Sequence, residues 1–474
     1  MPRTKARTHY VCDACGNDTP KWAGKCPSCG EWNRLAEVRV DRKESRSGGW
    51  TGGAPVAATE LSAIATDETP RLGVASPEVA RVLGGGIVPG SLVLLAGDPG
   101  IGKSTLLLRL AAEVARDLGE VVYVSGEESA TQVKMRADRL GLSGEGLFLL
   151  QVTSLDAMMG HLAERKPALV VVDSIQTVYD EALSSAAGSV GQVRECTRVL
   201  LEWAKRSGCP VLLSGHVTKG GDVAGPRVLE HMVDVVLYLE GDPISAWRLL
   251  RGVKNRFGST NEVGVFEMTS DGMVDVQDPS QAFISERREG APGSVVVSTI
   301  EGSRPILAEV QALTNPSMLP APRRVSNGLD LNRVLMVCAV LSRHAGLPLA
   351  SQDVIVNVAG GIRIGEPAAD LAAAVAIASS LRNSPIRPQM AAVGEVGLSG
   401  EIRRVPQIGR RVHEAARLGL KTCLVPAGNR DDVGRVAGLE TVPVETLRQA
   451  VAAALGAGAV HAAAVAADLP ELFE

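Results

Sequence analysis

Residues 97–104 read GDPGIGKS, and this octapeptide decides the fold of the surrounding chain. It satisfies the phosphate-binding pattern G-x-x-x-x-G-K-[ST] and follows an apolar run of strand length, SLVLLA at 91–96. An amphipathic stretch of helical length, LLLRLAAEVARDLG, comes after it. This order of strand, loop and helix predicts that the backbone of the loop wraps the phosphates of a nucleotide. The alternative is a glycine-rich turn that binds no ligand, but such a turn does not need a strand before it and a helix after it.

Each part of the loop has an expected task. The glycines let the backbone approach the phosphates, and the Lys103 ammonium neutralises charge on the β- and γ-phosphates. The Ser104 hydroxyl is expected to bind Mg²⁺ where the helix begins. ATP and Mg²⁺ are therefore the expected cofactors. The predicted nucleotide-binding residues are Gly97, Asp98, Pro99, Gly100, Ile101, Gly102, Lys103, Ser104 and Thr105.

Three further catalytic side chains are expected at the same edge of a parallel sheet. Asp173 ends the apolar run ALVVVD and is predicted to hold Mg²⁺. Glu127 is the predicted base, because Glu128 adjoins the expected helix cap Ser129, where a carboxylate already suits the helix dipole. His216 follows the run PVLLSG and could sense the γ-phosphate, although a passively buried histidine is the alternative.

The first 30 residues contain two CxxC pairs, which suit a metal site. A C-x2-C-x10-C-x2-C spacing can place four thiolates around one tetrahedral Zn²⁺, and a redox pair or chance clustering is the alternative. So short a unit cannot form a core that offsets its chain entropy, so metal binding would supply its folding energy. Four protein ligands indicate a structural ion. The predicted ligands are Cys12, Cys15, Cys26 and Cys29.

Two tryptophans lie within and beside this cysteine pattern. Trp22 and Trp32, together with Lys21 and Lys25, could form an exposed binding face. In a unit of this size aromatic rings more often cover the metal knuckles, so both interpretations stay open.

Length and composition indicate several α/β domains. The 474-residue chain exceeds one ordinary core, and its small aromatic fraction of 3% favours parallel sheets covered by helices over an all-β sandwich. Strand-length and helix-length runs alternate from about residue 70 to 270. The expected parts are a zinc module at 1–35, a flexible linker at 36–65, a P-loop ATPase domain at 66–275, a third domain at 285–455 and a tail at 456–474.

Charge and hydropathy limit the possible partners. A net charge of −4 leaves nucleic-acid contacts to local basic patches rather than to a global positive field. The basic start MPRTKARTHY has no apolar segment behind it, and no run of about 18 uncharged apolar residues occurs. We therefore expect a cytoplasmic protein with no membrane partner.

Five motifs together resemble the bacterial RadA (Sms) family: GDPGIGKS, SGEES, VVVDS, SGHVTKGG and KNRFG at 254–258. The resemblance covers nearly the whole chain. It implies an α/β protein with a zinc-ribbon-like module, a RecA-like core with a mostly parallel sheet, and a domain similar to the Lon protease domain. It also implies a homo-hexameric ring that moves on single-stranded DNA, processes branched or duplex recombination intermediates, and works with a RecA-type recombinase.

The KNRFG motif offers a physical reason for a ring. Lys254 and Arg256 are expected to alternate along one strand edge and to act as cationic fingers on a neighbour's γ-phosphate. Cations that merely solubilise an exposed strand are the alternative. In RecA-type rings two loops face the DNA channel, and here they would be residues 180–192 and 218–227, the second with Lys219 and Arg227.

The third domain resembles the Lon protease domain through residues 354–380 and 393–419. In the best-matching register Ala368 occupies the position of the Lon serine and Arg411 that of its lysine, so we expect no peptidase activity. Clustered arginines could instead track DNA phosphates, or they could form a solvated face. These arginines are Arg323, Arg324, Arg403, Arg404, Arg410 and Arg411.

Two other functions remain alternatives at this point. A regulatory ATPase or autokinase of the KaiC type shares the P-loop core, but that family lacks the zinc module and the KNRFG motif. An ATP-dependent protease of the Lon type is disfavoured by Ala368 and Arg411.

Overall fold

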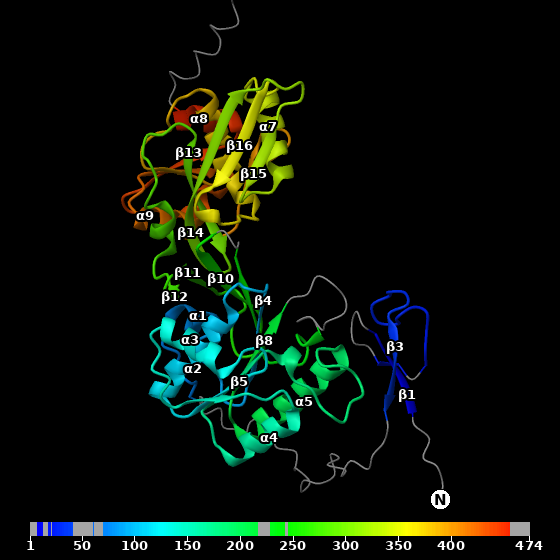
Figure 1. The fold of residues 1–474 in the computed structure, drawn as a ribbon. Coiled ribbons are helices and arrows are strands. Elements are labelled where there is room, and N and C mark those ends of the chain that lie inside the picture. Colours follow the sequence, from blue (N-terminus) through cyan, green and yellow to red (C-terminus); the bar gives the residue numbers. More distant parts are fainter. Residues whose placement is uncertain are drawn as a thin grey trace, which may run out of the picture. The chain divides into compact units, whose positions relative to one another are not determined.

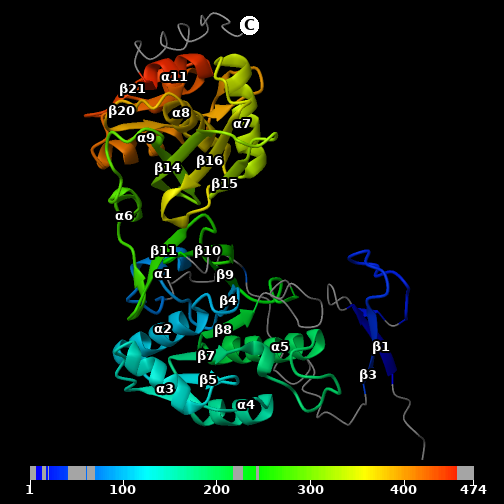
Figure 2. The ribbon, with the colours of Figure 1, turned by 45° about the horizontal axis from the view of Figure 1, so that its top comes forward.

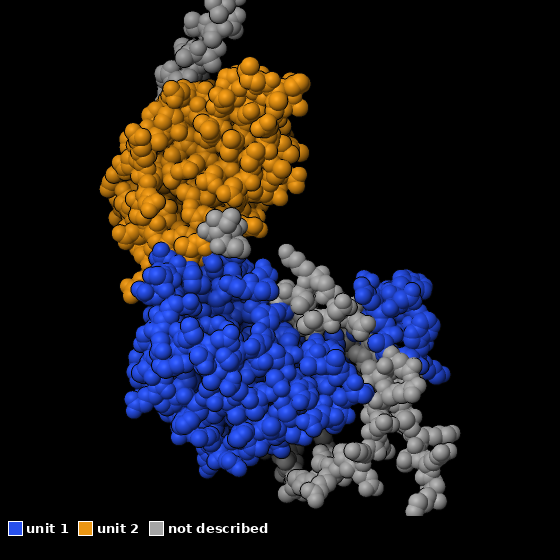
Figure 3. Space-filling model, viewed as in Figure 1, with its two compact units in different colours: residues 1–243, 248–275 blue, residues 244–247, 276–474 orange. Residues whose placement is uncertain are grey.

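The chain divides into two compact units, coloured separately in Figure 3. Unit 1 comprises residues 1–243 and 248–275, and unit 2 comprises residues 244–247 and 276–474. None of the described helices is long and apolar enough to cross a membrane. The computed structural model describes residues 7–12, 18–19, 21–40, 60, 70–216, 228–241 and 245–455. The domain limits given above stay a prediction.

The N-terminal cysteine-rich segment forms a small antiparallel sheet of its own (Figure 1). In this sheet β1 (Arg7–Cys12) lies between β2 (Asp18–Thr19) and β3 (Leu35–Val40). Its buried cluster consists of Cys12, Cys26 and Leu35. So small a cluster cannot offset the chain entropy by apolar burial alone, which agrees with a fold that depends on a metal ion.

The described part of the P-loop region is built on a nine-stranded sheet in the order β12-β11-β10-β9-β4-β8-β7-β5-β6. The strands from β9 to β6 in that order run parallel, and β10 is antiparallel to β9. The bounds are β4 Leu92–Gly97, β5 Val121–Ser125, β6 Leu147–Leu150, β7 Leu169–Asp173, β8 Val211–His216, β9 Val235–Glu240, β10 Trp247–Asn255, β11 Val263–Thr269 and β12 Gly272–Asp275.

Helices cover both faces of this sheet (Figure 2), so its central strands are buried and apolar throughout. Alternate residues of β4 serve the two faces, with Val93 and Leu95 packing on one side and Leu92 and Leu94 on the other. The first side belongs to α1 (Pro77–Leu83), α2 (Lys103–Asp117) and α3 (Ala130–Arg139). The second belongs to α4 (Leu155–Glu164) and α5 (Val190–Ser207), and a short 3-10 helix, η2, spans Ile175–Thr177.

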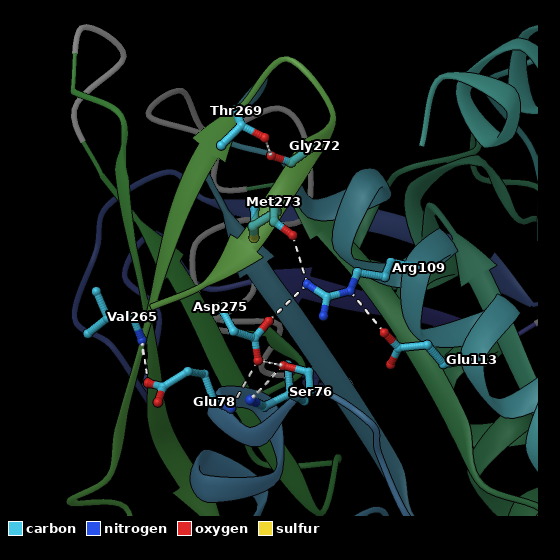
Figure 4. A network of polar contacts seen from close by, with 10 residues as sticks. Ser76, Glu78, Arg109, Glu113, Val265, Thr269, Gly272, Met273 and Asp275 are labelled. Atoms are coloured by element: carbon cyan, nitrogen blue, oxygen red, sulfur yellow. Dashed lines mark hydrogen bonds and ion pairs between the residues drawn. The ribbon is translucent and has the colours of Figure 1, made fainter. Parts of the chain in front are cut away.

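A polar network fixes the β11–β12 hairpin to the helix that follows the P-loop (Figure 4). Arg109 of α2 donates to the Met273 carbonyl at 2.7 Å and to the Asp275 carboxylate at 2.9 Å. The same carboxylate accepts from the Ser76 hydroxyl at 2.5 Å and from the Glu78 N–H at 3.2 Å, both at the start of α1. One carboxylate thus ties α1, α2 and β12 together.

Unit 2 is a second α/β layer structure. Its described residues form a seven-stranded sheet in the order β15-β16-β14-β13-β17-β20-β21, with a separate pair β18-β19. The strands are β13 Ser294–Glu301, β14 Arg304–Pro316, β15 Arg324–Asn327, β16 Gln352–Val358, β17 Met390–Ala392, β18 Glu395–Val396, β19 Ile402–Arg403, β20 Thr422–Pro426 and β21 Glu440–Val444. The helices are α6 Pro279–Ile284, α7 Leu331–His344, α8 Asp370–Leu381, α9 Ile408–Arg417, α10 Arg430–Val433 and α11 Leu447–Leu455, with 3-10 turns η4 Ala359–Gly361, η5 Pro367–Ala369 and η6 Ala427–Asn429.

Arg411 of α9 lies inside unit 2 rather than on its surface. Its side chain is 0% exposed, and its guanidinium makes two hydrogen bonds of 2.6 Å to the Glu366 carboxylate. Burial alone would raise the pKa of Glu366, but Arg411 and two further donors outweigh it and hold the pKa below its ordinary value. The pair therefore stabilises unit 2 above the unfolded carboxyl's pKa, and this contribution is lost as the pH falls through the folded pKa.

The prediction that Arg411 belongs to an exposed cluster of arginines is therefore wrong. Two other members are exposed but carry a carboxylate partner, Arg403 with Glu401 at 2.7 Å and Arg404 with Asp432 at 2.7 Å. Local pairing of this kind cancels the positive field that phosphate tracking requires.

Replacing Glu366 by Gln should destabilise unit 2 strongly, because the Arg411 guanidinium would stay buried without a counter-charge. We expect its free energy of unfolding to fall by about 3–5 kcal/mol. Hydrogen exchange of peptides from β13 and α9, followed against urea concentration, measures this change. As the matched control, Glu401→Gln removes an exposed pair and should cost at most about 1 kcal/mol. Equal losses in the two variants would contradict the assigned importance of the buried pair.

Candidate functional site

The carboxyl ends of four parallel strands bring the predicted catalytic positions together. Gly97 at the end of β4 is the register partner of His216 at the end of β8. Ser125 at the end of β5 is the register partner of Asp173 at the end of β7. Because β7 also pairs with β8, all four positions share one edge of the sheet, directly beside the P-loop.

The Lys103 side chain is buried against its own loop. Its ammonium donates to the Gly97 carbonyl at 2.9 Å and to the Asp98 carbonyl at 3.0 Å. Burial lowers the pKa of Lys103, while the charges of Asp173, Glu127 and Asp98 act in the opposite direction. A cation held by two backbone carbonyl oxygens is well suited to exchange them for the charged oxygens of a phosphate.

Gly102 lets the β11–β12 hairpin pack closely under the P-loop. A Cβ atom at this position would lie 2.7 Å from the Met273 methyl and 2.9 Å from the Met268 methyl. Its φ of +114° also belongs to the left-handed region that disfavours a side chain. As the cap of α2, Gly102 leaves the first N–H groups of the helix free of side-chain competition, as phosphate binding requires.

Asp173 is oriented by a tyrosine from the neighbouring strand. The Tyr123 hydroxyl donates to Asp173 Oδ2 at 2.7 Å. Burial, followed by the charge and hydrogen bond of Asp173, raises the pKa of Tyr123 well above its usual value, so the phenol keeps its proton. The Asp173 carboxylate and the Ser104 hydroxyl offer the oxygen ligands that Mg²⁺ prefers, so these residues fit such an ion.

The two adjacent glutamates have different environments. Glu127 accepts a hydrogen bond from the Ser174 hydroxyl, and His216 Nε2 lies 3.4 Å from the same carboxylate oxygen. Glu128 instead forms an ion pair with Arg136 of α3. Glu127 therefore belongs to the strand edge beside the P-loop, and the geometry favours it over Glu128 as a base.

Two residues at this edge belong to the motifs VVVDS and SGEES but had no role assigned from the sequence. Ser174, which directs Glu127, follows Asp173 in the chain, and a polar residue directly after a strand-ending aspartate is the signal that could have indicated it. Gly126 matters because its N–H donates to the Asp173 carbonyl at 3.0 Å, and a Cβ there would lie 2.0 Å from the Thr177 hydroxyl. A glycine is thus required for the glutamate segment to approach β7.

The cysteine sulfurs fit a tetrahedral metal ion. Tetrahedral Zn–S bonds of about 2.3 Å place sulfurs about 3.8 Å apart. The Cys12 and Cys29 sulfurs are 3.7 Å apart, and those of Cys12, Cys26 and Cys29 all lie within 4.8 Å of one another. Cys15 lies outside the described residues.

Comparisons with known proteins match each of these regions. Three family models match, described as an AAA domain at residues 58–222, a rubredoxin metal binding domain at 10–37 and subunit ChlI of Mg-chelatase at 335–429. The DNA repair protein RadA of Listeria monocytogenes is 50% identical over 96% of this chain and 100% of its own length. The chain belongs to the RadA family.

Other RadA proteins agree with this assignment. RadA of Bacillus subtilis is 47% identical over 96% of this chain and 100% of its own, and RadA of Pseudomonas aeruginosa is 49% identical over 94% and 98%. A crystal structure of the RadB recombinase is 26% identical and covers 44% of this chain and 100% of its own, with a TM-score of 0.36. The resemblance to RadA and the predicted α/β fold class are confirmed.

The KNRFG motif of this RadA-family chain lies at the end of β10. After a register break between Gly252 and Lys254 the strand ends at Asn255, and the Arg256 N–H still donates to the Asp234 carbonyl at 3.1 Å. The alternation of Lys254 and Arg256 along one edge stays a prediction. The Lys254 ammonium donates to the Glu230 carbonyl at 2.7 Å. Burial and then repulsion by Arg256 lower the pKa of Lys254, while the charges of Asp234 and Glu230 act in the opposite direction.

The motif lies at the opposite sheet edge from the P-loop of the same chain. Arg256 is 56% exposed at its side chain and forms a 3.4 Å ion pair with the buried Asp234 carboxylate. Asp234 also accepts from the Leu92 N–H at 3.0 Å, at the start of β4, whereas the P-loop follows Gly97 at its end. With a rise of about 3.3 Å per residue, about 16 Å of strand separate these ends. This exceeds the reach of an arginine side chain.

Of the two loops expected to face DNA, only the first is described. Gln192 of α5 holds it by donating to the Ser185 carbonyl at 2.9 Å and accepting from the Asp180 N–H at 2.8 Å. The loop at 218–227, with Lys219 and Arg227, lies outside the described residues.

Alanine and arginine occupy the two positions that correspond to the catalytic pair of the Lon protease domain. Ala368 lies in η5 and is buried in an apolar cluster, and Arg411 is bound to Glu366. A guanidinium held in this way cannot act as a general base, so we continue to expect no peptidase activity.

Replacing Glu127 by Gln should reduce the turnover of ATP by about 10²–10⁴-fold while nucleotide binding remains, because only the proton acceptor is lost. Glu128→Gln is the matched control, since it changes the neighbouring carboxylate and breaks only the pair with Arg136. Turnover from radiolabelled ATP and affinity for a fluorescent nucleotide measure the two effects. If the Glu128 variant were the inactive one, the assignment of the base would have to be exchanged.

Proposed function

We propose that the chain is a DNA-stimulated ATPase that assembles into a homo-hexameric ring, translocates on single-stranded DNA and drives branch migration in recombinational DNA repair. One observation carries the ring. The KNRFG cations lie at the opposite end of β4 from their own P-loop, so they can serve a nucleotide only in another subunit. The name of the RadA relatives, DNA repair proteins, supports the cellular role.

The proposed hydrolysis uses the residues of the sheet edge in separate roles. Glu127 removes a proton from the attacking water, and Ser174 and His216 hold its carboxylate in place. Lys103 moves from its loop carbonyls to the phosphates of ATP, where its charge opposes the negative charge that develops. Ser104 and Asp173 would hold Mg²⁺, which supplies further charge neutralisation when bound.

His216 has a second proposed role beside the P-loop. It adjoins Gly97 through strand register and contacts Glu127, so a γ-phosphate could be sensed by one imidazole that also contacts the base. The segment that follows His216 begins the loop at 218–227 proposed to face DNA. His216 therefore couples the binding of ATP at the P-loop to the binding of DNA at this loop.

The zinc module completes the proposal. Cys12, Cys15, Cys26 and Cys29 would hold a structural Zn²⁺, as the sulfur spacing of the three described cysteines supports. Branched or duplex DNA and a RecA-type recombinase are the proposed further partners, and action on bacterial DNA implies a cytoplasmic location.

Adding single-stranded DNA should raise the rate of ATP hydrolysis by the full-length chain, and Lys103→Ala should abolish both the basal and the stimulated rate. A coupled ATPase assay with and without a long oligodeoxythymidine measures this. If the rate of ATP hydrolysis did not change on addition of DNA and the protein transferred phosphate to itself, the result would instead support a regulatory autokinase.

Arg256→Ala should retain ATP binding but lose DNA-stimulated hydrolysis by about 10³-fold or more, as expected of a finger that acts on a neighbour. The Lys103→Ala variant has an inactive nucleotide site but an intact Arg256. Mixed rings of the two variants should therefore recover part of the activity. Turnover of the mixture against each variant alone measures this recovery.

Lys205→Ala is the matched control, because Lys205 also pairs with Asp234 at 2.8 Å but belongs to α5. It should keep most of the stimulated rate. No recovery in rings that contain both variants, or equal loss in the Lys205 variant, would show that Arg256 acts by neutralising Asp234 and not as a finger.

A further inference from the structure

The second metal knuckle carries a rigid backbone turn. The Asn33 N–H donates to the Gly24 carbonyl at 2.8 Å, and Lys25 and Trp32 form an antiparallel bridge. Two short chain segments are therefore held against each other on either side of the Cys26 and Cys29 pair. The backbone pairing therefore fixes the positions from which the side chains of these two segments extend.

Two indoles flank this turn and face solvent. Trp22 is 58% exposed and Trp32 is 67% exposed, although tryptophan is among the least favourable side chains to leave in water. A Cβ atom on Gly24 would lie 3.7 Å from the Trp32 ring and 3.9 Å from the Trp22 ring, so both rings border the same glycine. An alanine would already fill the gap between them.

These rings do not form the core of the metal module. Its buried cluster is made by Cys12, Cys26 and Leu35, with Tyr10 and Ala23 packed against it. Among the described residues, this favours the exposed binding face over the interpretation that the tryptophans cover the cysteine pairs. Paired exposed aromatics on a rigid turn are instead typical of a binding surface.

Cationic side chains outnumber carboxylates in the segment that carries the rings. Residues 21–36 contain three cations, Lys21, Lys25 and Arg34, and one carboxylate, Glu31. The Lys25 ammonium lies 5.8 Å from the centroid of the Trp32 ring. A whole chain of net charge −4 thus concentrates cations beside its two exposed indoles.

We propose that this tryptophan face, formed by Trp22, Trp32, Lys21 and Lys25, is a binding site for single-stranded DNA outside the ATPase core. Unstacked bases lie on the indoles, and the lysines contact the flanking phosphates. Every base has a π-face, so this contact is tolerant of sequence, as a protein that tracks along DNA requires. The proposal rests on the DNA partner proposed above.

A protein partner is a weaker fit for the same surface. Protein interfaces also enrich tryptophan, but their centres are depleted in lysine. Here the Lys25 ammonium stands over the Trp32 ring, and Lys21 precedes Trp22 in the chain. The charge therefore favours a polyanion.

The test measures binding of a fluorescent oligodeoxythymidine to the nucleotide-free, full-length protein by anisotropy. Trp22→Leu and Trp32→Leu should each weaken binding about 5- to 100-fold, and the Phe variants should retain most of the affinity. Met135→Ala is the matched control, because Met135 is equally exposed, at 67%, on α3. Zinc content per chain verifies that the module stays folded.

Salt dependence separates stacking from charge. Lys25→Gln should reduce the slope of log affinity against log salt by about 0.7, since one phosphate contact to a single strand is lost. Trp32→Leu should lower the affinity with an unchanged slope. Replacing a tryptophan with a purely structural role would not lower the affinity while leaving the salt slope unchanged.

Photo-crosslinking locates the contact directly. An oligonucleotide with 5-iododeoxyuridine should crosslink to the peptide that contains Trp22 or Trp32. Crosslinks confined to other peptides, with full affinity in both leucine variants, overturn the proposal, and loss of recombinase capture by those variants would then assign the face to a protein. Failure of the wild-type chain to bind the oligonucleotide would instead reject the proposed DNA function itself.

Discussion

The parallel hydrogen-bond ladder that joins β4, β8, β7 and β5 is the constraint on which the nucleotide site depends. It aligns Gly97 with His216 and Ser125 with Asp173, so residues that are far apart in the chain end at one edge. The polar groups then need only short extensions beyond the strands. A shift of one residue in any of these registers would turn a catalytic side chain to the opposite face of the sheet.

Most of the catalytic positions at this edge could be predicted from the sequence, because a change from apolar to polar residues marks the end of each strand. An apolar run followed by a polar residue indicates Asp173, Glu127 and His216 without any knowledge of pairing. The residues that adjust them are different. Tyr123 and Ser174 act across strands, through contacts that no local pattern contains.

Pairing over long distances in the chain also explains what the sequence concealed elsewhere. Arg411 finds Glu366 inside unit 2, 45 positions away, and a cluster of arginine letters cannot reveal that one of them is buried. Arg256 pairs with the buried Asp234 carboxylate, a partner that strand periodicity alone does not indicate. Fold class and site location thus follow from local signals, whereas the state of an individual cation depends on tertiary partners.

The Asp275 carboxylate has a consequence for the chain that follows it. Asp275 is the last residue of unit 1, and it is bonded to the nucleotide-binding helix through Arg109 and to α1 through Ser76. The last of the three chain crossings between the units, after Asp275, therefore leaves from a bonded strand end. A shortened chain that ends before residue 275 would lose this carboxylate, so Arg109 of α2 and Ser76 at the start of α1 would no longer share a bonding partner.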